Sequence, residues 1–309
     1  MNPLIRLIPP PLVRFFAKPY VAGDSVEKAV DVAALLLEKH GFLTTLDLLA
    51  EGIDSEEIVE QNVQTYLSMV DAVASDSRFG GDGQRPTLSL KPSSYTTSPM
   101  EDEGDAKGSK EALFRICEYA RERGVRVTVD MESRHWTDFT LDALDELHAA
   151  GHTDVGCVIQ TRLHRSAADL DRLPAGMRVR LVIGIYREPD EVAVTHKPEM
   201  KDRMLEFAAR LLDRGHIVEF ATHDETYIRR FLDEVVGTSD VAKDRFEVQM
   251  LYGVPRQKLL TDLVRQGIRV RLYVPFAMGW KMAIAYLRRR LDEYPAMALL
   301  VLKNWFLRG

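Results

Sequence analysis

The sequence has few cysteines and no long apolar run, and these absences exclude several classes of protein. Only Cys117 and Cys157 occur in 309 residues, both within apolar-periodic segments. One disulfide between them is the alternative, but we expect two buried free thiols in a reducing compartment. No run approaches the roughly 20 apolar residues of a membrane-spanning helix, and no cleavable signal peptide is apparent. The expected protein is cytoplasmic.

An excess of positive charge is also lacking. The formal net charge is -6, with 46% hydrophobic and 28% charged residues. Phosphate contacts need clustered excess cations, so we expect no nucleic-acid partner. The composition is that of a globular protein, and the length fits one large α/β barrel or two ordinary domains.

Two kinds of sequence motif are also absent. No GxGxxG follows the first strand-like run, which removes the strongest sign of a dinucleotide-binding Rossmann domain. No HxH pair or carboxylate cluster with metal-ligand spacing stands at the predicted strand ends. We therefore expect no metal site, and a metal-dependent hydrolase or isomerase is disfavoured.

Short apolar runs alternate with segments of helical spacing along most of the chain. The runs predict strands at residues 42–49, 86–91, 125–131, 154–160, 178–184, 217–222, 246–251 and 270–274. Helical spacing covers residues 54–76, 108–123, 138–150, 164–173, 199–214, 224–236, 256–266 and 281–293. Strict alternation implies a parallel sheet, and eight units in about 250 residues imply closure into a (βα)8 barrel. A doubly wound open sheet is the alternative.

The two ends of the chain differ from the alternating part. Residues 1–41 predict an N-terminal helical segment packed on the outside of the barrel, and residues 42–309 form the predicted barrel domain. Residues 1–16 and 298–307 are apolar with a few cations. They favour either docking onto the barrel wall or a peripheral contact with the inner face of a membrane.

Polar residues stand at the ends of several predicted strands, where barrel enzymes carry their catalytic groups. They are Lys91, Asp130, Gln160, Tyr186, Thr222, His223, Asp224 and Gln249. Asp224 is also expected to cap the helix that follows it. Arg180 lies inside the fifth strand, where a cation needs either an ion-pair partner or an anionic ligand.

The last predicted helix contains the sequence YLRRRLDE at residues 286–293. Arg289 and Arg290 offer two planar guanidinium groups, the geometry that holds a carboxylate by paired hydrogen bonds. A solvated helix face is the alternative interpretation of the same residues.

Taken together, these segments resemble the proline dehydrogenase family, in its monofunctional bacterial branch, over about residues 15–303. The stretches that carry the resemblance are LSLKPSS at 88–94, VTVDMES at 127–133, RLVIGIYREPDEVA at 180–193, ATHDE at 221–225, FEVQMLYG at 246–253 and YLRRRLDEYP at 286–295. The resemblance implies a distorted barrel with its final helix over the mouth as a lid. It also implies FAD as the cofactor, oxidation of L-proline to Δ1-pyrroline-5-carboxylate, and a quinone as electron acceptor.

The resemblance assigns roles to individual residues of this sequence. Asp130 and Arg180 would be catalytic, with Asp130 the acidic partner of Lys91 and Arg180 close to flavin N5. The residues expected around proline are Lys91, Tyr186, Tyr286, Arg289 and Arg290. The residues expected to bind FAD are Met131, Gln160, Arg180, Ile183, Gly184, Ile185, Thr222 and His223.

Two segments depart from the family pattern. The sequence VIGIY at 182–186 stands where the family has VKGAY, so Ile183 replaces a lysine and Ile185 an alanine. The stretch PFAMGWKMAIAY at 275–286, before the paired arginines, also differs. These departures leave open a flavin-binding barrel of the same descent with impaired activity or with another cyclic imino acid as substrate.

Overall fold

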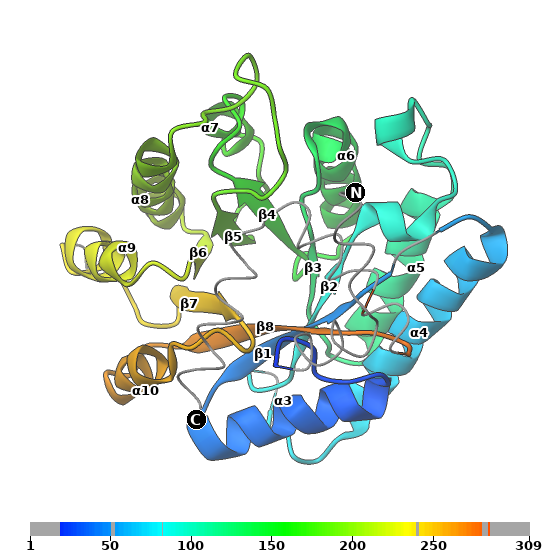
Figure 1. Cartoon of the computed structure of the whole chain (residues 1–309), viewed down its shortest axis with the longest axis horizontal. Helices are drawn as coiled ribbons and strands as arrows, with labels where there is room; N and C mark the ends of the chain where they lie inside the picture. Colours follow the sequence, from blue (N-terminus) through cyan, green and yellow to red (C-terminus); the bar gives the residue numbers. More distant parts are fainter. Residues whose placement is uncertain (1–18, 51–52, 82, 239–240, 280–283, 285–309) are drawn as a thin grey trace.

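The computed structural model describes residues 19–50, 53–81, 83–238, 241–279 and 284. A closed ring of parallel strands lies at its centre, each strand paired with the next and the last paired with the first (Figure 1). The strands are β1 (Leu43–Leu48), β2 (Thr87–Leu90), β3 (Val127–Val129), β4 (Gly156–Gln160), β5 (Arg178–Val182), β6 (Ile217–Ala221), β7 (Phe246–Leu251) and β8 (Val270–Phe276). The barrel prediction is confirmed, and the doubly wound sheet is excluded.

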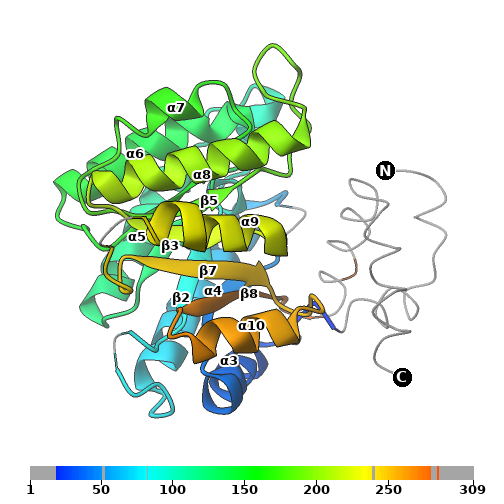
Figure 2. The same ribbon diagram turned by 90° about the vertical axis from the view of Figure 1, so that its left-hand side faces the viewer.

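Helices surround the strands, and Figure 2 shows several of them side by side along one side of the barrel. The described α-helices are α3 (Val26–His40), α4 (Glu56–Ser75), α5 (Ser109–Glu122), α6 (Thr137–Ala149), α7 (Ser166–Asp169), α8 (Lys197–Asp213), α9 (Glu225–Arg230) and α10 (Gln257–Arg265). A π-helical turn (Phe231–Val236) continues α9, and short 3-10 helices span Pro92–Tyr95, Met100–Asp102 and Arg134–Trp136. The predicted helix at 281–293 lies outside the described residues, apart from residue 284.

Capping side chains fix where several helices begin. Ser25 accepts a hydrogen bond from the backbone N–H of Lys28 at the start of α3, and Ser55 accepts one from Ile58 at the start of α4. Asp224 accepts the N–H of Thr226 at 3.0 Å and caps α9, as predicted. Each cap satisfies a donor that the first turn of the helix leaves without a partner.

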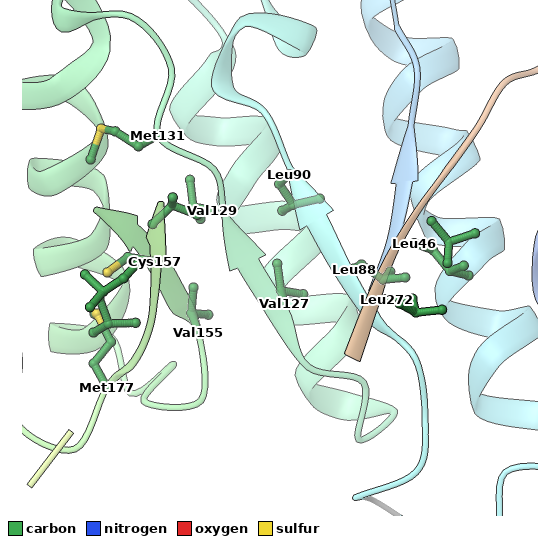
Figure 3. Close-up of a cluster of buried hydrophobic side chains, with 14 of the residues drawn as sticks. Leu46, Leu88, Leu90, Val127, Val129, Met131, Val155, Cys157, Met177 and Leu272 are labelled. Atoms are coloured by element: carbon green, nitrogen blue, oxygen red, sulfur yellow. The ribbon is translucent and has the colours of Figure 1, made fainter. Parts of the chain in front are cut away.

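The apolar core lies between the strands and the helices. Figure 3 shows part of this core on the first four strands, including Leu46, Leu88, Val129 and Cys157. Both cysteines are buried free thiols, as predicted. Alternate residues along each strand point to opposite faces, so the intervening side chains face the interior of the barrel.

The N-terminal helix α3 closes the outer wall. It packs on β1, β8 and α4, the place on the barrel wall where a helix following the eighth strand would otherwise pack. Its buried face includes Ala29, Val30 and Ala33. Within the described ranges, no helix combines the length and apolar character needed to cross a membrane.

Candidate active site

Charged and polar side chains fill the barrel interior, in place of the branched apolar residues common in such barrels. Arg180 on β5 shows this most clearly, because it bonds Ser89 on β2 at 3.3 Å and Gln249 on β7 at 2.8 Å. Neither strand is a neighbour of β5, so these bonds cross the interior. The buried polar residues that belong to this network are Asp47, Ser89, Arg180, Glu219, Glu247, Gln249 and Arg271.

Asp130, directly after β3, is the centre of the network. Its Oδ1 accepts hydrogen bonds from Ser89 Oγ at 2.7 Å and from Arg180 Nη1 at 2.8 Å. Its Oδ2 accepts one from the Tyr273 hydroxyl at 2.8 Å and lies 3.6 Å from Lys91 Nζ. The structure therefore brings together Lys91, Asp130 and Arg180, three of the site residues predicted from the sequence.

Lys91 has a closer acidic partner than the one predicted. Its ammonium forms an ion pair with Asp47 on β1 and also donates to the Tyr273 hydroxyl at 3.2 Å. Burial raises the pKa of Asp47, and nearby Asp130 adds to this, although Lys91 opposes it. Asp130 is thus a secondary partner of Lys91 at 3.6 Å, and its shortest charged contact is with Arg180.

Sequence reasoning missed Asp47 and Tyr273. Both lie inside predicted apolar strands rather than at their ends; Asp47 is buried and Tyr273 is half-buried. Arg180 was recognised because it is a charged residue within an apolar run. Asp47 in TTLDLL has the same feature and could have been recognised in the same way.

Arg180 is almost fully buried, with 4% of its surface exposed. Its Nε donates to Gln249 Oε1 at 2.8 Å, and Gln249 in turn donates to Glu219 and Glu247, each at 2.7 Å. Burial disfavours the charge, but Asp130 and Glu219 outweigh it and raise the pKa of Arg180. Its Nη2 is buried and has no hydrogen-bond partner among the described residues. The guanidinium therefore has ion-pair partners, one of the two alternatives raised by the sequence. The anionic ligand, the other alternative, stays a prediction.

Glu219 on β6 is the register partner of Arg180 on β5 and belongs to the same network. It pairs with Arg178 at 2.8 Å, and Arg271 pairs with Glu247 at 2.6 Å. Burial opposes ionisation of Glu219, but the guanidinium groups around it prevail and lower its pKa. This buried charge pattern fixes Gln249 and, through it, the orientation of Arg180.

Gln160 and Gly184 meet at the ends of β4 and β5. Gln160 donates to the backbone carbonyl of Glu132 at 2.6 Å, and its buried Oε1 has no partner in the part of the chain that the structure describes. Gly184 has a φ of 92°, and a Cβ there would lie 2.8 Å from Cδ of Arg162 and closer still to Gln160 Oε1. Only glycine satisfies both the backbone and the space at this position.

Glu132 ties two loops at this end of the barrel together. Its carboxylate accepts hydrogen bonds from the backbone N–H and the hydroxyl of Ser93, at 2.8 and 2.6 Å, just past Lys91. Its carbonyl holds Gln160. Burial raises the pKa of Glu132 to about 7, against the lowering effect of the Ser93 bonds. No role was predicted for Glu132 from its position in the sequence.

The other predicted cofactor residues lie at the same end of the barrel with ordinary surroundings. Met131 packs into the apolar core (Figure 3), Ile183 is half-buried and Ile185 is 46% exposed. The carbonyl of Tyr186 accepts a hydrogen bond from Arg162. None of these contacts tests the predicted roles.

Thr222 and His223 follow β6. Thr222 Oγ1 accepts the N–H of Asp224 at 3.2 Å, and His223 Nε2 accepts the N–H of Leu251 at 3.0 Å. Burial, aided by the charge of Arg256, lowers the pKa of His223 to about 4. The imidazole is therefore neutral at pH 7, with its proton on Nδ1.

The three remaining predictions fall where the structure gives no description. Tyr286, Arg289 and Arg290 lie outside the described residues, as does the lid helix that would carry them. Over the ranges that are described, no group of three or more His, Cys, Asp or Glu side chains is arranged to hold a metal.

Comparison with known proteins links this chain to proteins of the same size. A profile of the family described as proline dehydrogenase matches residues 32–299. Proline dehydrogenase of Deinococcus radiodurans is 34% identical over 295 residues, covering 93% of this chain and 89% of that protein. Proline dehydrogenase 1 of Bacillus subtilis is 31% identical over 295 residues, covering 94% of this chain and 91% of that protein.

Solved structures share the fold. Proline utilization A from Bdellovibrio bacteriovorus, inactivated by N-propargylglycine, superposes with a TM-score of 0.77 at 24% identity, over 91% of this chain and 32% of that one. A mutant of proline utilization A from Bradyrhizobium japonicum gives 0.73 at 21% identity, over 89% and 30%. The chain spans about a third of the length of these two proteins.

The curated relatives align over about nine-tenths of their own length, as the monofunctional branch requires. The prediction of an oxidoreductase that acts on proline is confirmed at the level of the family. With its closed eight-stranded barrel and the profile matched across it, the chain belongs to the proline dehydrogenase family.

Proposed function

We propose that the chain is an FAD-dependent proline dehydrogenase that oxidises L-proline to Δ1-pyrroline-5-carboxylate by hydride transfer to flavin N5. One observation carries the proposal most directly. Arg180 is buried and held at two nitrogens by Asp130 and Gln249, yet its Nη2 has no partner within the described ranges. A buried donor without a partner costs about 1–3 kcal/mol, so a ligand that accepts from it is favoured.

The residues present fit FAD. Arg180 Nη2 is an unpaired donor and Gln160 Oε1 an unpaired acceptor, both buried. The edge of an isoalloxazine ring offers the complementary set, with acceptors at its carbonyl oxygens and ring nitrogens and a donor at N3. Gly184 leaves room for a close approach between these groups. When bound, FAD would supply the two-electron chemistry, and the chain would supply orientation and charge.

Apolar surface at the same end of the barrel supports this placement. Among the described residues, the large apolar side chains most exposed include Ile185, Leu251 and Met278, at 46, 42 and 51%. They follow or end β5, β7 and β8, so all lie at the carboxyl ends of the strands. A planar ring system is a suitable cover for such a surface.

The substrate would lie beside Lys91 and Asp130. Hydride leaves the carbon next to nitrogen, so the amine must be neutral at that moment, and the resulting iminium then loses its N–H proton. Arg289 and Arg290 would hold the carboxylate, and Tyr186 and Tyr286 would exclude water. Holding a substrate in a reactive geometry of this kind is worth several kcal/mol of barrier.

The acceptor and the location remain part of the same proposal. Electrons would pass from FAD to a quinone, and the protein would be cytoplasmic with a peripheral contact at the inner face of the membrane. The apolar stretches proposed for that contact, residues 1–16 and 298–307, lie outside the described residues. We also propose that an N-terminal segment ends at residue 41 and the barrel domain begins at residue 42. Thr222 and His223 would bind the adenosine half of FAD.

The visible spectrum of the purified protein tests the proposal. A flavin spectrum, together with proline-dependent reduction of a soluble quinone analogue, is the expected result. Yellow protein that L-proline does not reduce would favour the alternative, which is an impaired barrel or one specific for another cyclic imino acid. That alternative is considered because Ile183 stands where the family has a lysine. Colourless protein that cannot be reconstituted with FAD would overturn both.

A further inference from the structure

Arg162 lies beside the predicted cofactor segment, and the family resemblance assigns it no role. It follows β4 by two residues, and its side chain lies against Gly184, where an added Cβ would be 2.8 Å from its Cδ. Its Nη1 donates to the carbonyl of Tyr186. Its guanidinium therefore lies along residues 184–186, two of which are predicted to contact FAD.

The charge of Arg162 is not neutralised. Its Nε is buried without a hydrogen-bond partner, and no carboxylate pairs with it in the described part of the chain. The neighbouring arginines differ in this respect, since Arg134 pairs with Glu188 at 2.8 Å and Arg165 with Asp169 at 2.9 Å. An unpaired, partly buried cation beside a ligand site favours an anionic ligand.

We propose that Arg162 is a further cofactor-binding residue whose guanidinium binds an anionic oxygen of FAD. The inference rests on the proposed function. Two groups of FAD supply that chemistry, namely the diphosphate and the reduced, anionic ring. Because Ile183 is uncharged, Arg162 would be the cation that serves this stretch of the cofactor site.

Three variants separate charge from simple bracing of the loop. Arg162→Gln keeps a donor for the Tyr186 carbonyl without the charge, and Arg162→Lys keeps the charge without the planar fork. Arg269→Gln is the matched control. Arg269 also has a buried unpaired Nε and bonds backbone carbonyls, but it precedes β8 at the opposite end of the barrel.

The dissociation constants of FAD and riboflavin are measured by fluorescence on reconstituted apoprotein, and the midpoint potential on the loaded protein. If Arg162 binds the diphosphate, Arg162→Gln should weaken FAD binding by roughly ten- to a hundredfold, the value of one charge-assisted hydrogen bond, while Arg162→Lys stays much closer to the parent. Arg269→Gln should match the parent.

Two arms of the experiment distinguish the sources of the anionic oxygen. If the diphosphate is bound, FAD affinity falls and riboflavin affinity does not. If the reduced ring is bound, the midpoint potential becomes more negative, by about 30 mV for each tenfold loss of preference for the reduced form. Added salt should weaken FAD binding to the parent more than to Arg162→Gln.

Unchanged FAD affinity and potential in Arg162→Gln would overturn the inference. Equal losses in the Gln and Lys variants would also overturn it, because they would show bracing rather than charge. If the parent protein itself binds no FAD, the proposed function fails first, and this outcome is recognised before any variant is compared.

Discussion

Single residues carry the chemistry, and their burial decides what they can do. Asp130 is bonded by Ser89, Arg180 and Tyr273 at once, so its carboxylate cannot turn without breaking three hydrogen bonds. Such shared bonding preorganises a site before any ligand arrives.

Glu132 should make the stability of the fold depend on pH. Its pKa rises from 4.5 to about 7 on folding, so the native state binds the extra proton between these values. The stabilisation is complete below pH 4.5 and is lost as the pH rises through 7, by about 3 kcal/mol at most. Urea unfolding at pH 5 and pH 8 should show this loss for the parent and a smaller one for Glu132→Gln. Parallel pH profiles for the two proteins would contradict the assignment.

Arg289 tests the proposed carboxylate clamp. Arg289→Met should raise the KM for L-proline by roughly ten- to a hundredfold, because a charge-assisted pair of hydrogen bonds is lost. The FAD content, measured from the absorbance ratio of the purified protein, should stay at the parental level. A variant that proline reduces as readily as the parent would show that the carboxylate is held elsewhere.

The sequence located Lys91, Asp130 and Arg180 but not Asp47 or Tyr273. Strand ends can be recognised in a sequence from glycine, proline and polar residues, so the residues at these ends can be proposed as site residues. A polar residue inside a strand faces either the barrel interior or the surrounding helices, and the two-residue period alone does not say which. Asp47 could be assigned only once β1, β2 and β8 were side by side.

At the scale of elements, the strands were predictable because each is buried on both sides. Parallel strands of this kind appear as nearly continuous apolar runs. Their ends were less predictable. The third strand was expected at 125–131 but spans Val127–Val129, because only Thr128 and Val129 pair with β4 before the chain turns into the site.

Gly184 follows β5 and lies at the candidate active site, so a change there affects both the strand end and the site. Gly184→Ala places a Cβ in a left-handed conformation and against Gln160, so we expect a loss of about 1–2 kcal/mol from the backbone and a marked fall in FAD affinity. Gly176→Ala is the matched control, since Gly176 has a φ of 77° but no neighbour within 4 Å of an added Cβ. Urea unfolding and FAD titration of both variants provide the comparison. Equal effects on FAD affinity would contradict a role for the space at Gly184.

For the whole molecule, alternation and length predicted the barrel, but not its charged interior. Polar residues within strands such as VEFAT and FEVQML suggest a solvent-facing side. In the closed barrel they face one another, and ion pairs such as Arg271 with Glu247 satisfy them. Closure is a property of the complete ring, so this pairing cannot be seen in any single segment.

The packing of α3 against the outer wall of the barrel can be tested by substitutions in this helix. Ala33 is fully buried between α3 and the barrel, so Ala33→Asp should destabilise the protein by more than about 3 kcal/mol. Leu35→Asp adds the same charge to the same helix at a side chain that is 46% exposed, and should change the stability by only about 0.5 kcal/mol. Urea unfolding measures both. Equal tolerance of the two changes would mean that α3 is not part of the barrel wall.

We propose that the Arg180–Asp130 network binds and orients FAD and proline. Anaerobic mixing of the purified protein with L-proline, followed by the flavin absorbance, tests it most directly. We expect complete bleaching, with one Δ1-pyrroline-5-carboxylate formed for each FAD. Bleaching should be at least tenfold slower in Arg180→Lys, which keeps the charge but cannot make the same set of hydrogen bonds. A flavin that L-proline leaves oxidised, or equal rates in the two proteins, would contradict it.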